Sequence, residues 1–481
     1  MTTMQIGMNF GHELVIDLFA GGGGASQGIQ NALGRGPDVA VNHDPEAISM
    51  HQANHPDTAH YCASVFKVNP ITVTRNRPVG LLWASPDCTH HSKAKGGKPV
   101  SKKIRGLAWV VVKWARRTRP RAIALENVEE FEDWGPLTKE GKPCPVRKGQ
   151  QFQEFVHQLR RLGYQVEWKL LRACDYGAPT IRRRLFLFAR RDGLPIHWPK
   201  PTHGDPQSLA VKRGKLQPWP AAATCIDWSI PAPSIFDRKK PLADNTLARI
   251  AKGIQKFVIE SADPFILTID HQSSPNGVYD IDAPLTTITS KARHCLVAAF
   301  LAKHYTGVTG IDVRQPTGTV TCNDHHAVVA THLLNLKGSA RRARGMDQPA
   351  PTITAGGTHA ALVAALMAPY YGSGSGTTGR DLRDPSPTVT SVDRLQLVTV
   401  DIDSTTYVLV DIGMRMLQPR ELYRAQGFPD SYIIEHGANG ERFSKRSQVR
   451  MCGNSVSPPV AEAIVAANFA HETQFMQELA G

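Results

Sequence analysis

A glycine-rich turn near the start of the chain constrains its fold more than any other feature. The apolar run Leu14–Leu18 leads through Phe19 and Ala20 into four consecutive glycines, Gly21 to Gly24, and then into a segment of helical composition. Glycines at such a strand–turn–helix unit let the backbone approach a ligand closely and leave the amides of the helix N-terminus accessible. The nicotinamide fingerprint spaces its glycines differently, so the turn favours another nucleoside-containing cofactor. Packing in an open α/β sheet also accounts for such a turn.

Two further apolar runs end in residues that can carry chemistry. Val79–Ala84 leads to Cys88, and between residues 88 and 125 there are eleven Lys or Arg and no Asp or Glu. A thiol at a strand end in an electropositive segment is where a thiolate nucleophile forms, although a lone cysteine is also often a small buried apolar residue. The run Ala122–Leu125 ends in Glu126. Because ligands lie beyond the carboxyl ends of strands in doubly wound sheets, we expect Cys88 and Glu126 in one crevice. A surface glutamate capping the next helix is the alternative.

A third segment combines basic residues with a strand. Arg182 and Arg184 alternate ahead of the apolar run Leu185–Ala189, so an extended backbone places both guanidinium groups on one face. Planar guanidinium groups suit a phosphate or the edge of a base. A charged edge strand that is protected against aggregation has the same pattern.

Taken together, these segments resemble the DNA (cytosine-5)-methyltransferase family of bacterial or phage type. The resemblance covers about residues 12–200 and 412–470, and the order of the motifs makes it far more specific than any one of them. The matching segments are the cofactor motif 17–24, the nucleophile segment 85–92, the glutamate motif 126–128, the arginine motif of Arg182 and Arg184, a structural motif at 418–429, and a last motif at 453–456 followed by 458–461.

The resemblance implies an α/β fold: an S-adenosylmethionine-dependent, Rossmann-like doubly wound sheet with an inserted, β-rich target-recognition domain. We expect residues 1–200 to form the first part of the catalytic and cofactor-binding domain, 201–410 the recognition domain, and 411–481 the return to the catalytic domain. A final helix from about 459 to 469 would pack near Asp17 and complete the cofactor pocket.

The resemblance also implies the site. Cys88 would add to carbon 6 of a flipped-out cytosine, Glu126 would donate a proton toward ring nitrogen 3, Arg182 would anchor the base carbonyl or the adduct, and Arg184 a neighbouring phosphate. The methyl donor would be S-adenosyl-L-methionine. Its expected contacts are Asp17, Phe19, Ala20, Gly21, Gly23, Gly24, Asn42, Asp44, Ser64, Pro86, Asn454, Ser455 and Val456.

Several positions depart from the family pattern. Asp87 and Thr89 flank Cys88 where the family has proline and glutamine, and Asp87 should oppose thiolate formation because it places a negative charge beside the thiol. Ser64 replaces a carboxylate that would meet the adenine amino group, and Thr180 replaces the glutamine that opens the arginine motif. The ribose-binding acid falls at Asn42, with Asp44 two residues on. The thiol, the glutamate and both arginines remain.

Composition agrees with a polyanionic partner. The formal net charge is +14 and the pI is near 9.4. A glycine-hinged loop could close on double-stranded DNA, with phosphates meeting its lysines; a solvated basic loop is the alternative. These lysines are Lys93, Lys95, Lys98, Lys102 and Lys103. The eight cysteines form no CxxC pair, so we expect no metal and a reduced, cytoplasmic compartment. We find no signal peptide and no bilayer-spanning stretch, and we expect a monomer whose activity requires no cognate restriction endonuclease.

The segment between the two matching blocks has a different character. Residues 195–220 read as a Pro- and Trp-containing linker, and residues 240–254 as a helix. A degenerate repeat then follows in steps of 32, 33 and 36 residues, with Thr-Ile/Val-Thr cores of strand composition and apolar runs behind them. The cores are 284–289, 316–321, 349–354 and 385–390. We expect DNA recognition here, with a purely structural repeat as the alternative; the nearby residues that could reach DNA are Arg293, His325, His326, Arg341 and Arg394.

Three alternative functions are weighed. The same motifs serve a branch that methylates cytosine in tRNA, against which the long insertion argues. A catalytically silent DNA-binding relative would explain the departures at Asp87 and Ser64, but Cys88 and Glu126 are intact. An amino-methylating DNA enzyme ranks last, because the chain lacks an Asp/Asn-Pro-Pro-aromatic motif.

Overall fold

The computed structural model describes residues 13–87, 106–139, 142–227, 229–230, 239 and 417–480, together with eight strands between 265 and 415. Three predictions lie outside the described residues: the nucleophile Cys88 with the five loop lysines, the helix at 240–254, and the Thr-Ile/Val-Thr cores. Of the residues expected near DNA in the insertion, only His326 is described, as the first residue of a strand.

The first sheet is mixed and has seven strands in the order β3-β2-β1-β4-β5-β7-β6. The strands are β1 (Leu14–Leu18), β2 (Val39–Asn42), β3 (Ala59–Cys62), β4 (Val79–Ala84), β5 (Ala122–Asn127), β6 (Gln165–Arg172) and β7 (Arg183–Arg190). Neighbours among β1 to β5 run parallel, whereas β7 is antiparallel to both β5 and β6. This arrangement confirms the predicted Rossmann-like α/β sheet, with an antiparallel strand added near one edge.

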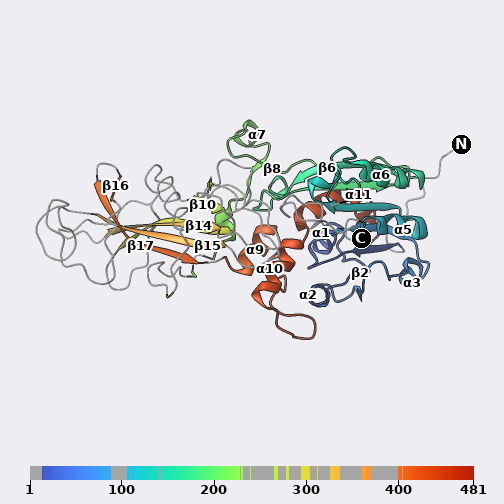
Figure 1. Ribbon diagram of the computed structural model, residues 1–481, viewed down its shortest axis with the longest axis horizontal. Coiled ribbons are helices and arrows are strands. Elements are labelled where there is room, and N and C mark those ends of the chain that lie inside the picture. The colour runs from blue at the N-terminus through green and yellow to red at the C-terminus, as the bar shows by residue number, and fades with distance from the viewer. Residues whose placement is uncertain are drawn as a thin grey trace, which may run out of the picture.

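Helices cover both faces of this sheet (Figure 1). The helices of this part of the chain are α1 (Gly24–Leu33), α2 (Pro45–Asn54), α3 (Pro70–Thr74), α5 (Trp109–Thr118), α6 (Gln150–Arg161), α9 (Pro419–Gln426), α10 (Lys445–Asn454) and α11 (Pro458–Ala480), with 3-10 turns η2 (Glu129–Phe131) and η3 (Ala173–Tyr176). Alternation along the buried strands divides the core in two. Leu14, Ile16 and Leu18 pack with α5 and α6, whereas Val15 packs with α1 and α11.

The final helix returns to the first one, as expected. A methyl group in place of the Gly28 hydrogen would lie 2.5 Å from the carbonyl oxygen of Pro458 and 2.6 Å from Cβ of Ala461, so α1 and α11 pack with almost no side chain between them. The apolar residues Val460, Ile464 and Val465 join α1 in the same core. The helix is longer than predicted, because it runs to Ala480.

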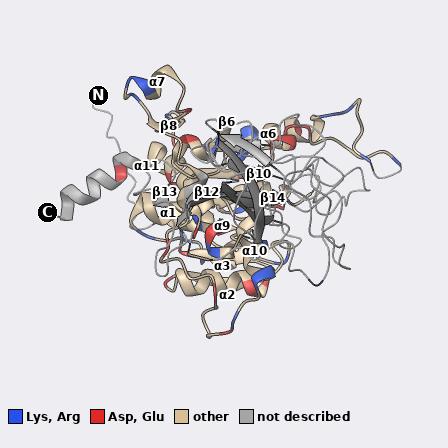
Figure 2. Cartoon of the chain, turned by 90° about the vertical axis from the view of Figure 1, so that its left-hand side faces the viewer, with Lys and Arg blue, Asp and Glu red and all other residues tan. Residues whose placement is uncertain are grey.

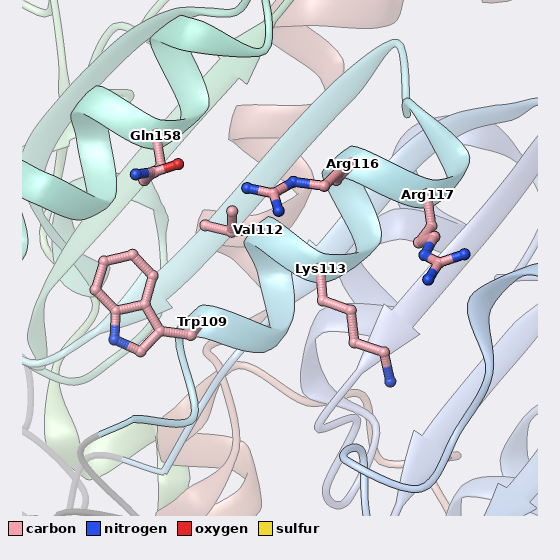
Figure 3. A pocket seen from close by; sticks show the side chains of 6 residues that line it. All are labelled: Trp109, Val112, Lys113, Arg116, Arg117 and Gln158. Carbon is pink, nitrogen blue, oxygen red and sulfur yellow. The ribbon is translucent and has the colours of Figure 1, made fainter.

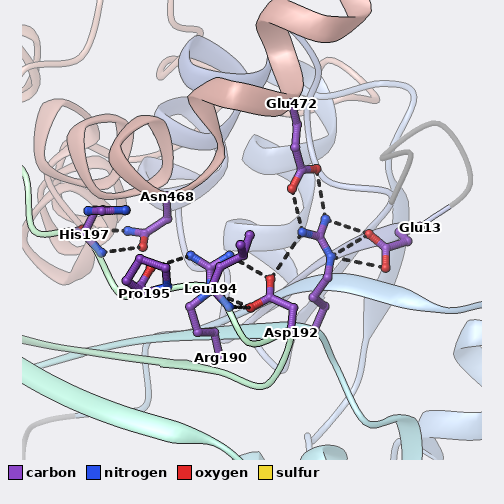
Figure 4. Close-up of polar contacts among 9 residues, drawn as sticks. Glu13, Arg190, Asp192, Leu194, Pro195, His197, Asn468 and Glu472 are labelled. Atoms are coloured by element: carbon purple, nitrogen blue, oxygen red, sulfur yellow. Dashed lines mark hydrogen bonds and ion pairs between the residues drawn. The ribbon is translucent and has the colours of Figure 1, made fainter. Parts of the chain in front are cut away.

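Figure 4 labels Glu13, Asp192 and Glu472, three carboxylates that meet at the far edge of the sheet, where the parallel strands begin. Arg121, directly before β5, is the cation among them and connects this edge to Glu472 of α11. Its guanidinium lies 2.7 Å from Glu13 Oε2, 2.6 Å from Glu472 Oε1 and 3.6 Å from Asp192 Oδ2. Arg190 donates to both carboxylate oxygens of Asp192 at 2.7 Å. Burial pushes the pKa of Asp192 upward, but Arg190 and Arg121 outweigh it and hold that pKa below its ordinary value. The cluster is almost enclosed, so each charge depends on the others.

The segment at 195–220 is not a linker. Short strands β8 (His203–Gly204) and β9 (Gln217–Pro218) pair within it, and a one-turn helix, α7 (Leu209–Lys212), lies between them. Trp198 Nε1 donates to Glu167 at 2.9 Å, and Trp219 Nε1 donates to Asp175 at 2.9 Å. The tryptophans therefore anchor the segment to β6 and η3, which corrects the prediction made from its proline content.

A second, antiparallel sheet has the order β11-β10-β12-β14-β15-β17-β16, with β13 beside β12. Its strands are β10 (Phe265–Thr268), β11 (Val278–Asp280), β12 (His294–Lys303), β13 (Ile311–Asp312), β14 (His326–Asn335), β15 (Ala360–Pro369), β16 (Thr399–Ile402) and β17 (Thr405–Arg415). The long strands β12, β14 and β15 are the apolar runs that follow the repeat cores. In Figure 1, α9 and α10 lie between the two sheets. No described helix is long and apolar enough to cross a bilayer.

Replacing Arg121 by methionine should lower the free energy of unfolding by about 3–5 kcal/mol, because it leaves Glu13, Asp192 and Glu472 without their shared cation. Urea denaturation followed by circular dichroism measures this loss. Arg35→Met is the control: its side chain is one-third exposed and pairs with Asp38, so it should cost under about 1 kcal/mol. Equal losses in both variants would contradict a special role for the Arg121 cluster.

Candidate functional site

The candidate site lies at the edge where the parallel strands end. β1 and β4 are neighbours although β2 and β3 separate them in sequence, so the direction of winding reverses between them; ligands of such sheets bind at this point. Glu126 follows Ala122 and Ala124 on the face of β5 that α1 and α11 cover, and Arg184 shares that face with Phe186 and Phe188 on β7. Strand alternation therefore brings the glutamate and the arginine to one place.

Glu126 lies between two guanidinium groups. Its Oε1 is 3.7 Å from Nη2 of Arg182 and 3.4 Å from Nε of Arg184, and the residue is only 7% exposed. Arg182 is also buried and donates to the carbonyl oxygen of Gly453 at 3.2 Å. No described residue hydrogen-bonds to Glu126 Oε1. The ion pairs hold the carboxyl group in position and leave this oxygen able to bind a ligand.

Asn127 connects this carboxyl group to the segment that leads to Cys88. Its Nδ2 donates to the carbonyl oxygen of Pro86 at 3.1 Å, and its Oδ1 accepts from the backbone N–H of Val128 at 2.9 Å. Asn127 is 1% exposed. The ends of β4 and β5 are therefore fixed to each other two residues before Cys88.

The turn after β1 has the backbone geometry of a ligand-binding loop. Gly21 and Gly23 have positive φ, and so does Phe19, with φ of 63°. A bulky residue in the left-handed region costs of order 1–3 kcal/mol and is found mostly where function requires it. The first turn of α1 has no side-chain cap and no acidic residue, so its N-terminal amides can bind an anion.

The C-terminal segment covers this turn closely. A methyl group on Gly24 would lie 2.1 Å from the carbonyl oxygen of Val456. Tyr432 donates its hydroxyl to the carbonyl oxygen of Gly22 at 2.8 Å. Ser455 is buried with its hydroxyl near Gly22, and no described residue hydrogen-bonds to it, whereas Asn454 is exposed.

Two buried polar atoms beside the turn thus lack a described partner: Oδ1 of Asp17 and Oγ of Ser455. A carboxylate, a hydroxyl and an uncapped helix N-terminus fit the carboxylate and the ammonium group of an amino-acid ligand. Burial raises the pKa of Asp17 to about 7, although a hydrogen bond from Ser26 lowers it in part. The residues of the turn therefore fit the methionine part of S-adenosylmethionine.

At the end of β2, the predicted ribose contacts differ in what they already bind. Asp44 caps α2 by accepting from the N–H of Glu46 at 3.1 Å, and it also pairs with Arg450 of α10. Asn42 is half-buried and accepts from the N–H of Asp44 at 2.9 Å. Ser64 lies after β3, two strands away from β1, and its backbone oxygen accepts from Lys67.

The sequence did not identify Tyr432, Arg450 or the role of Asn127. Asn127 lies within the glutamate motif 126–128, so the motif includes it, but nothing in the sequence indicates that it bonds to Pro86. Tyr432 and Arg450 contact residues roughly four hundred positions away, and no local pattern signals such pairs.

A cavity of about 490 Å³ lies elsewhere, between α5 and α6 (Figure 3). Its lining includes Lys113, Arg116 and Arg117 on α5. Lys113 donates to the carbonyl oxygens of Phe66 and Val68, at 3.3 and 3.0 Å, so its charge already supports the fold. The cavity contains none of the predicted site residues.

Comparison with known proteins identifies the family. The family model described as C-5 cytosine-specific DNA methylase matches residues 14–231 and 350–469, which is more than half of the chain. The chain belongs to this family. The methylase is therefore a DNA (cytosine-5)-methyltransferase that uses S-adenosylmethionine.

The chain is also similar to individual proteins. The methylase is 25% identical over 459 residues to the Type II methyltransferase M.AgeI of Thalassovita gelatinovora, covering 93% of this chain and 97% of that protein. It is 32% identical over 196 residues to the Type II methyltransferase M.XorII of Xanthomonas oryzae, covering 39% and 43%. A solved Escherichia coli structure, of a putative DNA modification methyltransferase encoded within a prophage, matches with a TM-score of 0.40 at 18% identity, covering 95% and 98%.

Tyr432→Phe should weaken S-adenosylmethionine binding by about fivefold, because the carbonyl of Gly22 loses its buried donor. Isothermal titration calorimetry measures this affinity. Tyr164→Phe removes an equally buried hydroxyl that donates to Pro120 at the opposite edge of the sheet, so it should leave the affinity unchanged. An unchanged affinity in Tyr432→Phe would separate the hydroxyl from cofactor binding.

Proposed function

We propose that this methylase acts on double-stranded DNA and methylates carbon 5 of a flipped-out cytosine within a specific sequence, through a covalent adduct of Cys88. The observation that carries the proposal is the enclosed Glu126, held by Arg182 and Arg184 next to the strand end that Asn127 ties to the Cys88 segment. A carboxyl group and two cations beside a thiol are what addition to an electron-poor ring requires.

Each side chain then has one task. The Cys88 thiolate forms a bond to carbon 6, while Glu126 donates a proton to ring nitrogen 3 so that charge does not accumulate on the ring. Carbon 5 becomes an enamine-like nucleophile. S-adenosylmethionine supplies an electrophilic methyl group to it when bound. Loss of the carbon 5 proton to water then breaks the bond between the Cys88 sulfur and carbon 6 and releases Cys88 as a thiolate, while the proton on ring nitrogen 3 returns to Glu126.

The two arginines are proposed to bind parts of the DNA substrate that Cys88 and Glu126 do not contact. Arg182 would hold the base carbonyl or the adduct, and Arg184, the more exposed of the two, a neighbouring phosphate. Asp87 is exposed on the segment leading to Cys88, so its charge is partly screened by water. This placement moderates the expected opposition to thiolate formation.

Cofactor contacts follow from the geometry of the turn. We assign the amino-acid part of the methyl donor to Asp17, Ser455 and the start of α1. The remaining expected contacts stand as proposals: Phe19, Ala20, Gly21, Gly23, Gly24, Asn42, Asp44, Ser64, Pro86, Asn454 and Val456. Asn42 is the stronger candidate for the ribose, because Asp44 already caps α2 and pairs with Arg450.

A base inside a duplex must leave the stack to reach this site, at a cost of a few kcal/mol. The lysines of the loop after Cys88 would contact phosphates in that step, and the net charge of +14 would attract the DNA. Described basic residues also gather on α10 and around α7 (Figure 2). We assign target recognition to the inserted sheet, so that residues 1–200 and 411–481 form the catalytic domain and 201–410 the recognition domain. A cytoplasmic monomer, active without a cognate endonuclease, completes the proposal.

Sequencing of DNA from cells that express the methylase, with a readout specific for 5-methylcytosine, tests the proposal directly. We expect methylation at one recurring short site, and none in a Cys88→Ala control. Cys88→Ser should also lose methyl transfer while keeping DNA affinity, because a hydroxyl is barely ionised near neutral pH. Methylation that persists without the thiol would rule out the adduct; methylation of tRNA instead of DNA would reassign the substrate.

Glu126→Gln should slow single-turnover methyl transfer by roughly two to four orders of magnitude, because an amide cannot donate the proton to ring nitrogen 3. Glu129→Gln is the matched control: it lies three residues on, is half-buried, and pairs with Arg183 at 3.6 Å. It should leave the rate within about threefold, since surface pairs contribute little. Equal rates in the two variants would remove Glu126 from the chemistry.

A further inference from the structure

A chain of buried hydrogen bonds runs from the glycine turn toward the far side of α2. Ser26 Oγ on α1 donates to Asp17 Oδ2 at 2.7 Å, and Nε2 of His51 on α2 lies 2.8 Å from Ser26 Oγ. Nδ1 of His51 lies 2.8 Å from Nε2 of His60 on β3. Asp17, Ser26 and His51 are completely buried, whereas His60 is half-buried. The chain therefore connects the cofactor turn to the protein surface.

Every link of this chain can run in either direction. When Asp17 is ionised, it only accepts, so Ser26 donates to it, His51 donates through Nε2, and His60 donates to Nδ1 of His51. When Asp17 is protonated, it can donate to Ser26, Ser26 to His51, and His51 to His60. Hydroxyl and imidazole groups both donate and accept, so each hydrogen bond between these four residues is kept in either state; His60 also bonds to the backbone of Thr58. A lysine or arginine in place of His51 could support only the ionised state.

Apart from Ser26, few described groups stabilise the ionised form of Asp17. Its Oδ1 has no described hydrogen-bond partner, and none of the described residues forms an ion pair with it. Burial raises its pKa to about 7 against the single donor Ser26. The carboxyl group is thus near the balance of its two forms at neutral pH.

None of the neighbouring titratable groups determines the protonation state of Asp17 in place of the hydrogen-bonded chain. His55 packs on His51 with ring centroids 4.6 Å apart, but burial lowers its pKa to about 4 and it bonds instead to Gln30. Burial raises the pKa of Tyr432, which stays neutral. At the rim, Arg450 is paired with Asp44 and Glu46. The flanking strands β2 and β4 contain no titratable residue. His51 has both ring nitrogens engaged, and the described residues hold no group suited to a metal ion.

We propose that His51 is a positioning residue that couples binding of the methyl donor to loss of a proton from Asp17. S-adenosylmethionine carries a sulfonium and an ammonium group, so its net positive charge favours the ionised carboxylate at the turn. The proton leaves Asp17 for Ser26, Ser26 passes one to Nε2 of His51, Nδ1 of His51 passes one to His60, and His60 releases one to water. The demethylated product, S-adenosylhomocysteine, lacks the sulfonium charge. Its binding therefore releases a smaller fraction of a proton from Asp17. This coupling rests on the proposed assignment of Asp17 to the methyl donor, but it does not depend on Cys88 as the nucleophile.

The direction of the pH dependence follows from linkage. The pKa of Asp17 is lower with the donor bound than without it, so affinity rises with pH through about pH 7 and levels off when Asp17 is ionised in both states. Between the two pKa values, affinity changes by up to about tenfold per pH unit.

Calorimetry of the full chain with S-adenosylmethionine and with S-adenosylhomocysteine, from pH 6 to 9 in two buffers of different ionisation enthalpy, counts the protons released. We expect release near pH 7 with the first ligand and less with the second. Asp17→Asn should abolish it. His51→Phe should move the midpoint upward by about one pH unit, because the carboxylate loses the polarised donor behind Ser26. His51→Gln, which keeps an amide donor, should move it back.

His55→Phe is the matched control, since it removes a buried imidazole beside the chain but outside it; its midpoint should stay at the wild-type value. A weaker affinity in His51→Phe at every pH with an unmoved midpoint would mean a purely structural role and would overturn the proposal. So would proton release that survives in Asp17→Asn. If His51→Phe does not fold, His60→Asn at the half-buried end serves instead, with a smaller upward shift expected and an unmoved midpoint counting against the coupling.

Discussion

The contact between the glycine turn and the C-terminal segment is the constraint on which the catalytic half depends. Val456 and Gly24 touch through backbone alone, and Tyr432 donates to the turn from the same part of the chain. These groups meet across more than four hundred residues of sequence. Because the entropy of closing a loop grows only slowly with its length, a long insertion between the two blocks costs this contact little. Evolution can therefore enlarge the insertion without rebuilding the cofactor site.

Two clusters of buried charged residues in the same sheet differ in whether every charge has a partner within the protein. At the far edge, Arg121 is one cation among three carboxylates, and every charge has a partner. At the site edge, Glu126 is one carboxylate between two cations, with an oxygen that no described residue hydrogen-bonds. The first arrangement only stabilises the fold. The second holds a carboxyl group in place and leaves one of its oxygens without a hydrogen bond from any described residue, so that oxygen can bind a ligand.

The sequence predicted what depends on local pattern. Apolar runs located β1, β4 and β5, and strand alternation placed Arg182 and Arg184 on one face, where both now lie against Glu126. The site could thus be assembled from strand ends alone, because parallel strands finish at a common edge. The C-terminal helix was also predicted, since the last family motif runs into its first turn.

Interactions between distant segments could not be predicted in this way. Residues 195–220 read as a linker because prolines dominate the local pattern, whereas the partners of Trp198 and Trp219 lie about thirty and forty residues away. In the insertion, the repeat cores lie outside the described residues, and the long strands that are described are the apolar runs behind them. Asp44 was expected among the cofactor contacts, and no local pattern signals its pairing with Arg450 of α10.

The cofactor site carries costs that the rest of the fold does not. Phe19 has a left-handed backbone, Asp17 is fully buried with one oxygen that no described residue hydrogen-bonds, and the hydroxyl of Ser455 is buried near Gly22. Each would destabilise an ordinary core, because buried polar groups need partners and bulky residues avoid this conformation. A ligand that supplies those partners recovers the cost on binding, so cofactor and fold are linked by mass action. The amphoteric chain behind Asp17 lowers one of these costs in the free enzyme, since it satisfies the carboxyl group in either protonation state. The site is therefore stable without its cofactor. Binding of the positively charged methyl donor then favours the ionised form of Asp17.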